Sequence, residues 1–143
     1  MEASADYEPA ESTNNLFGGN SNWRGPIWFP ANLLAVESLR GLYRVLGDAF
    51  TVELPTGSGR AMHLGAAADE IERRLVGLFR AGPDGRRPAD GPGALFAPGS
   101  EWTERPLFYE YFNGDTGEGL GASHQTGWTA LVASLIARRG RWS

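Results

Sequence analysis

The stretch FYEYFNGDTGEGLGASHQTGW, residues 108–128, is the most informative part of this chain. It places Glu110 between two aromatic residues on each side, and a glycine-rich turn and the polar run Ser-His-Gln-Thr follow before Trp128. Aromatic rings stack on pyranose faces, and a carboxylate between them can activate water or stabilise positive charge at an anomeric carbon. The stretch therefore indicates a sugar-cleaving site with Glu110 at its centre and Trp128 as a candidate aromatic wall. The alternative is a solvent-facing glutamate on an alternating strand, because aromatic residues also suit strands.

Length and composition indicate one domain, residues 1–143, with a modest core. The chain is 41% hydrophobic and holds 20 Gly and 9 Pro beside 5 Trp, 7 Phe and 4 Tyr. This many aromatic residues argue against disorder throughout. Together with the glycines they predict long structured loops over a sparse set of helices.

Charge and residue content exclude several classes of function. The net charge of −4 argues against nucleic acid as a partner. The chain has no cysteine and only two isolated histidines, His63 and His124, so we expect no metal site and no cofactor. No apolar run reaches the length of a membrane span and no signal peptide is recognisable, so we expect a cytoplasmic protein without a membrane partner.

Hydrophobic periodicity predicts three amphipathic helices, over residues 30–46, 64–80 and 126–139. Pro30 suits a first helical turn, and Gly47 suits the position after a helix end. Residues 51–54 form a short extended piece, and residues 81–101 are typical of a surface loop. The pattern predicts an all-α chain with long loops and no reliable sheet.

A second aromatic group, WRGPIW, lies at residues 23–28, just before the first predicted helix. In one interpretation Trp23 and Trp28 are sugar platforms, and Arg24 donates to sugar hydroxyls or orients a carboxylate. In the other, the tryptophans pack in the core and Arg24 pairs with a carboxylate. The residues alone leave both interpretations open.

Three further polar residues are candidates around Glu110. Asp115 lies in a run typical of a turn, Asn-Gly-Asp-Thr-Gly, and is also a candidate to support Glu110 through a hydrogen bond. His124 and Gln125 are candidates either to bind sugar hydroxyls or to cap the final helix. Ser123-His124 lacks the motif of a serine hydrolase nucleophile.

Three segments together resemble glycoside hydrolase family 63, the processing α-glucosidases, and related bacterial proteins with a mannosylglycerate-hydrolase-type catalytic domain. They are YEPAE with LFGGNSNWRGPIWFP (residues 7–11 and 16–30), PTGSGR (55–60) and residues 108–128. The resemblance implies the C-terminal part of a catalytic domain, an incomplete portion of an (α/α)6 barrel or toroid. It also implies an inverting hydrolase of α-glucosides and oligosaccharides. The family motif falls on residues 110–117, which makes Glu110 the general base, and the Trp-Arg-Gly motif places Trp23 and Arg24 in the sugar pocket.

The chain departs from the family in its general acid. An inverting mechanism needs two carboxyl groups about 6.5–9.5 Å apart, and the family's acid is an Asp well upstream of the Trp-Arg-Gly motif. Asp6 is the only Asp before Trp23, and its surroundings do not resemble the acid motif. The resemblance therefore implies a fragment that is inactive alone and has an oligosaccharide substrate and the missing N-terminal part as partners. The alternatives are a non-catalytic carbohydrate-binding remnant and a truncated gene product.

Overall fold

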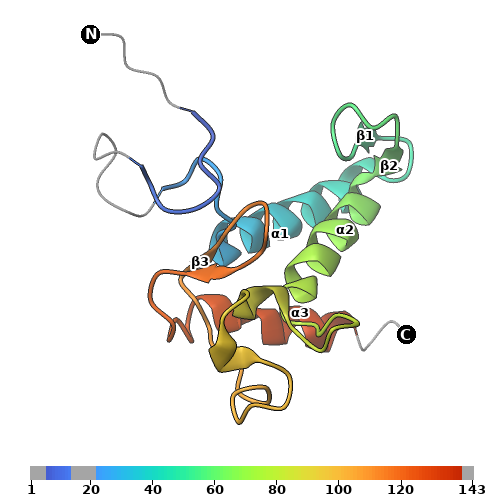
Figure 1. The fold of residues 1–143 in the computed structure, drawn as a ribbon. Coiled ribbons are helices and arrows are strands. Elements are labelled where there is room, and N and C mark those ends of the chain that lie inside the picture. The colour runs from blue at the N-terminus through green and yellow to red at the C-terminus, as the bar shows by residue number, and fades with distance from the viewer. Residues whose placement is uncertain (1–5, 14–21, 140–143) are drawn as a thin grey trace, which may run out of the picture.

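The computed structural model describes residues 6–13 and 22–139. Two long helices, α1 (Phe29–Leu46) and α2 (Leu64–Gly77), pack along each other. They are joined by the antiparallel hairpin β1 (Thr51–Glu53) and β2 (Ala61–His63), which lies at one end of the pair (Figure 1). The helix pair is the scaffold on which the rest of the chain is arranged.

The second half of the chain lies near the opposite end of the helix pair (Figure 1). Its two short strands, β3 (Tyr111–Phe112) and β4 (Gly119–Leu120), pair antiparallel with Phe112 opposite Gly119. The helix α3 (Val132–Arg139) packs against α2. Three 3₁₀ turns complete the elements: η1 (Pro88–Asp90), η2 (Ala94–Phe96) and η3 (Thr129–Leu131).

The first helix begins and ends where the residues at its ends predicted. α1 has its proline in the first turn, and Gly47 ends the helix at φ 64° while its N–H donates to the Tyr43 carbonyl over 2.8 Å. This confirms the predicted start and the predicted glycine cap. α2 begins after His63, whose Nδ1 accepts the Ala66 N–H over 3.1 Å. His63 is therefore structural, because its side chain caps the start of α2.

The core lies where α1 begins and α2 ends. Its buried residues come from both helices, the 81–101 segment, β3 and α3: Phe29, Leu75, Val76, Leu78, Ala89, Phe112, Val132 and Leu135. Complete burial of an aromatic or aliphatic side chain contributes about 1.5–3 kcal/mol. Because Phe112 is fully buried in this cluster, the core anchors β3 and with it the segment that carries Glu110.

The prediction of an all-α chain, an incomplete portion of an (α/α)6 barrel, is wrong. Three α-helices and two two-stranded antiparallel sheets give a mixed α/β structure within the described residues. The strands are only two or three residues long. That is too short for an alternating pattern to show in the sequence, and they exist because tertiary packing brings their partners together.

Two further predictions on local structure need correction. The third helix starts later than residue 126, because a 3₁₀ turn covers Thr129–Leu131 and the α-helix begins at Val132. The 81–101 segment is not only a surface loop, since it forms η1 and η2 and buries Ala89 and Phe96.

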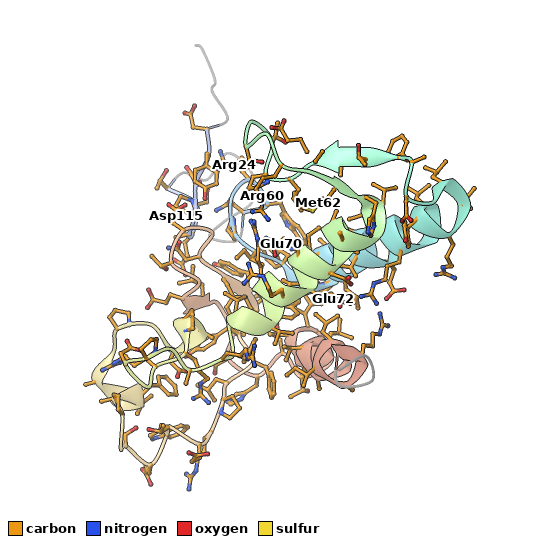
Figure 2. The ribbon with its side chains drawn as sticks, turned by 90° about the vertical axis from the view of Figure 1, so that its right-hand side faces the viewer. Arg24, Arg60, Met62, Glu70, Glu72 and Asp115 are labelled. Atoms are coloured by element: carbon orange, nitrogen blue, oxygen red, sulfur yellow. The ribbon has the colours of Figure 1, made fainter. Side chains whose placement is uncertain are left out.

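Charged residues of α1 point toward the other helices. Arg40 bridges Asp69 (2.9 Å) and Glu72 (2.8 Å) of α2, and Glu72, marked in Figure 2, is 1% exposed. Glu37 pairs with Arg138 of α3. Large apolar side chains of α1 are exposed instead: Leu34, Leu42, Val45 and Leu46. No helix in 6–13 or 22–139 is long and apolar enough to cross a membrane.

Candidate functional site

Glu110 lies immediately before β3 and is half-buried. Its Oε2 accepts the Ala122 N–H over 3.4 Å. Gly121 has φ 71°, and a Cβ there would lie 2.7 Å from Glu110 Oε2. The chain after β4 can therefore pass directly beside the carboxylate only because residue 121 is glycine.

A second glycine of this segment lies against the neighbouring side chain. A Cβ at Gly119 would overlap the ring of Tyr109. Gly117 and Gly121, before and after β4, have φ values of 77° and 71°, a backbone conformation that favours glycine. The glycine-rich stretch was predicted to be a turn, whereas residues 119 and 120 form β4 and the turn ends before it.

An aromatic stack lies next to Glu110. The rings of Trp23 and Trp28 are stacked at 4.0 Å between centroids with 9° between planes, and Trp28 stacks on Tyr111 at 4.7 Å and 25°. Trp128 meets Trp28 edge-on at 6.3 Å. Trp28 and Tyr111 are buried, whereas Trp23 is 64% exposed. The stack is thus anchored at its inner end and presents Trp23 at its outer end.

The segment before α3 holds the backbone that carries Glu110. Trp128 Nε1 donates to the Glu110 carbonyl over 3.0 Å, and the hydroxyl of fully buried Thr129 donates to the Tyr109 carbonyl. Trp128, a candidate aromatic wall, therefore also contacts the Glu110 main chain. Thr129 was not among the predicted site residues, since a single threonine in a helical pattern gives no signal.

Arg24 forms an ion pair with the carboxylate of Glu8. Arg24 Nη2 lies 2.6 Å from Glu8 Oε2, and the two side chains are 19% and 12% exposed. The Thr13 hydroxyl donates to Glu8 Oε1 over 2.6 Å. This hydrogen bond, then the Thr13 N–H and the charge of Arg24, lower the pKa of Glu8, and partial burial opposes them.

Asn22 connects Arg24 to the aromatic stack. Its side chain is buried, with Oδ1 accepting the Arg24 N–H over 3.0 Å and Nδ2 donating to the Ala10 carbonyl. Its own carbonyl accepts Trp28 Nε1 over 2.9 Å. Asn22 was not among the predicted site residues. The available signal was an asparagine two residues before Arg24, where it can bond the backbone two positions on.

Asp115 lies in a turn, as one of its two interpretations predicted. Asn113 Oδ1 accepts the N–H groups of Asp115 (2.9 Å) and Thr116 (3.1 Å). Asp115 Oδ1 accepts the Tyr7 hydroxyl over 2.8 Å, and this bond raises the pKa of Tyr7. Arg24 and Asp115, both labelled in Figure 2, are each bound to the N-terminal segment, Arg24 by Glu8 and Asp115 by Tyr7.

His124 and Gln125 lie between β4 and η3. The Gln125 N–H donates to the Phe108 carbonyl over 2.8 Å, and the Gln125 carbonyl accepts the N–H groups of Trp128 and Thr129. The backbone of Gln125 thus fixes the start of the last helical segment. His124 is exposed and pairs with Phe108 through an isolated parallel bridge.

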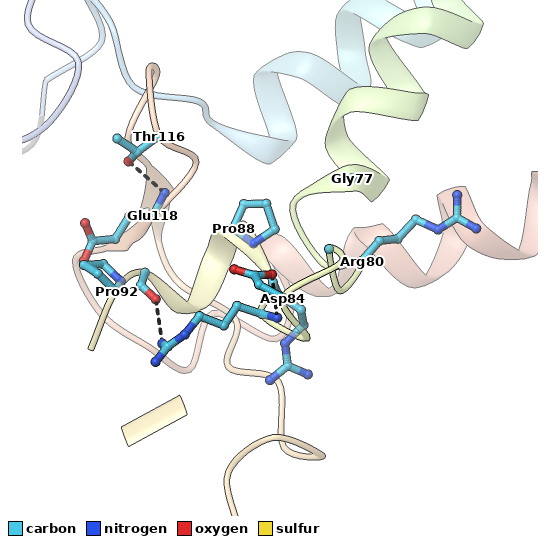
Figure 3. Close-up of a pocket in the computed structure, with 11 residues that line it drawn as sticks. Gly77, Arg80, Asp84, Pro88, Pro92, Thr116 and Glu118 are labelled. Atoms are coloured by element: carbon cyan, nitrogen blue, oxygen red, sulfur yellow. Dashed lines mark hydrogen bonds between the residues drawn. The ribbon is translucent and has the colours of Figure 1, made fainter. Parts of the chain in front are cut away.

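A cavity of about 810 Å³ lies away from the aromatic stack, between the end of α2, the 82–92 segment and the turn of the β3–β4 hairpin (Figure 3). None of the predicted site residues lines it. Two of its arginines are engaged by the chain itself, since Arg86 donates to the Gly93 carbonyl (2.9 Å) and Arg87 to Asp90 (2.8 Å). We therefore place the candidate site at the aromatic stack.

Among the described residues no group of His, Asp and Glu is arranged to hold a metal ion.

Comparisons with known proteins give two relatives, both from Saccharomyces cerevisiae. Uncharacterized protein YMR196W is 46% identical over 142 residues, 98% of this chain, and a mannosyl-oligosaccharide glucosidase is 27% identical over 128 residues, 87% of the chain. The chain spans only 13% and 12% of the length of these relatives. No family model matches. Most of the chain is thus similar in sequence to a segment of a glucosidase, which indicates a glycosidase-related protein.

Proposed function

We propose that the chain carries the general base of an inverting glycoside hydrolase of α-glucosides and oligosaccharides. One observation supports this most: the Glu110 carbonyl is bound by Trp128, which belongs to a group of four aromatic rings whose outer member, Trp23, is exposed. In this role Glu110 removes a proton from the attacking water, while the sugar rests on an aromatic face. The similarity to a mannosyl-oligosaccharide glucosidase agrees with this chemistry.

The proposal assigns different tasks to the surrounding residues. Trp23 is the platform for a pyranose ring, and Trp28 and Trp128 fix that platform and the Glu110 backbone in place. Arg24 shapes the site through its ion pair with Glu8. Exposed His124 and neighbouring Gln125 supply hydrogen bonds to sugar hydroxyls, and Asp115 stabilises the hairpin turn.

The proposal also includes a protein partner, the remainder of a longer polypeptide. The relatives are about eight times longer than the matched segment. Apolar side chains of α1, among them Leu34 and Val45, are exposed and available for contact with it. That remainder would supply the general acid, whose contribution is typically about 10²–10⁴ in rate. The isolated chain should therefore bind oligosaccharide without hydrolysing it.

The decisive experiment places this chain in a complete enzyme. Residues 1–143 replace the matched segment of the yeast glucosidase, and hydrolysis of a glucosylated oligosaccharide is measured with Glu110→Gln and with a control, Glu118→Gln. Glu118 belongs to the same hairpin and is also half-buried. Glu110→Gln should lower kcat by at least about 100-fold and leave substrate binding nearly unchanged. If Glu110→Gln retains most activity, or if both variants lose it equally, Glu110 is not the base.

A second candidate is a carbohydrate-binding function without catalysis, favoured by the exposed ring of Trp23. It predicts that Trp23→Ala abolishes binding of maltose to the isolated chain, while Glu110→Gln changes no activity of the chimera. Tryptophan fluorescence titration with maltose and the activity assay together separate the two functions.

A further inference from the structure

The N-terminal segment 7–13 contacts both sides of the candidate site. On one side Glu8 pairs with Arg24, and on the other the Tyr7 hydroxyl donates to Asp115 over 2.8 Å. Between them the Pro9 carbonyl accepts the Gly114 N–H over 2.8 Å. Segment 7–13 therefore joins the loop that carries Trp23 to the turn of the hairpin that carries Glu110.

The three segments meet with no room for larger residues. A Cβ at Gly25 would overlap the Glu8 carbonyl, and a Cβ at Gly114 would overlap the Gly25 carbonyl and lie 2.8 Å from the Tyr7 hydroxyl. Close backbone approach at two glycines means that a shift of segment 7–13 is transmitted to the loop at residues 22–25.

Asn22 carries this connection to the aromatic stack. Its amide binds the Ala10 carbonyl, its Oδ1 binds the Arg24 N–H, and its carbonyl holds Trp28 Nε1. Trp23 lies between Asn22 and Arg24 in sequence. The backbone on both sides of Trp23 is thus fixed by contacts with segment 7–13.

We propose that Glu8 is a positioning residue for the carbohydrate platform: its ion pair with Arg24 holds Trp23 flat against Trp28. The inference rests on the proposed function, because it deepens the role of the same site. Glu8 does not touch the sugar in this arrangement. The Glu8 carboxylate accepts a hydrogen bond from the Arg24 guanidinium at 2.6 Å. It accepts two more from Thr13, one from the hydroxyl at 2.6 Å and one from the N–H at 3.3 Å. Charge-assisted hydrogen bonds of this kind are stronger and more directional than neutral ones.

The same geometry explains how Trp23 can be both exposed and ordered. Its only described aromatic partner is Trp28, so within the described residues one face of its ring is stacked. A platform open on the other face suits an uncharged pyranose, which binds by contact of its C–H groups with an aromatic ring. The charge of Arg24 next to it is balanced by Glu8, so the proposed ligand is an uncharged sugar.

The test compares Glu8→Gln with a matched control, Glu11→Gln, in the complete 143-residue chain. Two stacked indoles give an exciton couplet in circular dichroism, and Trp23→Phe identifies the part of the signal that belongs to this pair. Glu8→Gln should lose most of that couplet while the helical signal stays, and Glu11→Gln should retain it. Maltose, followed by tryptophan fluorescence, should bind about fivefold more weakly to Glu8→Gln.

The outcomes separate this inference from the proposed function. A couplet that persists in Glu8→Gln overturns the positioning role. If Glu8→Gln prevents folding, Arg24→Gln decides, because it removes the same ion pair from its other side. A weakened couplet in Arg24→Gln supports the role, and an unchanged one overturns it. If the couplet depends on Glu8 while no variant or wild type binds maltose, Glu8 positions Trp23 and the proposed sugar-binding function fails instead.

Discussion

The close approach of Gly121 to Glu110 makes a quantitative prediction. Gly121→Ala introduces two costs: a residue with a Cβ at φ 71°, and contacts of 2.7 Å with Glu110 Oε2 and 2.9 Å with a Tyr111 ring carbon. The left-handed backbone costs about 1 kcal/mol and overpacking about 1–3 kcal/mol. The expected loss in free energy of unfolding is therefore about 2–4 kcal/mol.

Gly99→Ala is the matched control for this variant. Gly99 has φ 85°, and its Cβ would meet nothing within 4 Å, so only the backbone cost of about 1 kcal/mol applies. Urea unfolding followed by tryptophan fluorescence measures both variants. Adding Glu110→Ala to Gly121→Ala should recover part of the loss, since it removes the crowded carboxylate. Equal costs for the two glycine variants, within about 0.5 kcal/mol, would refute the packing of residue 121 against the candidate base.

Three more results are expected. Trp128→Phe removes the N–H that binds the Glu110 carbonyl and should cost about 1 kcal/mol in urea unfolding. The control is Trp102→Phe, at a tryptophan that packs edge-on against Phe96 away from Glu110, and it should cost less. Two arginine partners lower the pKa of Glu70 from 4.5 to about 2, so their stabilising contribution is complete above pH 4.5 and is lost as pH falls toward 2. Unfolding measured against pH should show this loss in the wild type and not in Glu70→Gln. The exposed apolar face of α1 should bind an environment-sensitive dye, and Leu34→Glu with Val45→Glu should reduce the binding; an unchanged signal would place the dye elsewhere.

The main helices follow from sequence because their determinants are local. The repeat of apolar residues three and four positions apart, Pro30 in the first turn and Gly47 after the last one are readable within a short window, and α1 contains them as expected. The same holds for Glu70 and Arg74, one turn apart on α2 and 2.8 Å apart in the structure. The aromatic residues on both sides of Glu110 also indicated in the sequence the region where Trp28, Tyr111 and Trp128 meet in the structure.

The sheets and the site geometry depend on residues that are distant in sequence. β3 forms because Phe112 is buried against α1 and α3 and is bridged by Ile27, so its two residues carry no strand pattern of their own. Trp128 lies before the last helix instead of inside it, because its indole N–H is held by the Glu110 carbonyl 18 residues away. Arg24 meets Glu8 across 16 residues. The sequence by itself determined the helical scaffold and named candidate residues for a carbohydrate site. Only the tertiary structure decided which of these residues touch, since long-range contacts leave no periodic signal along the chain.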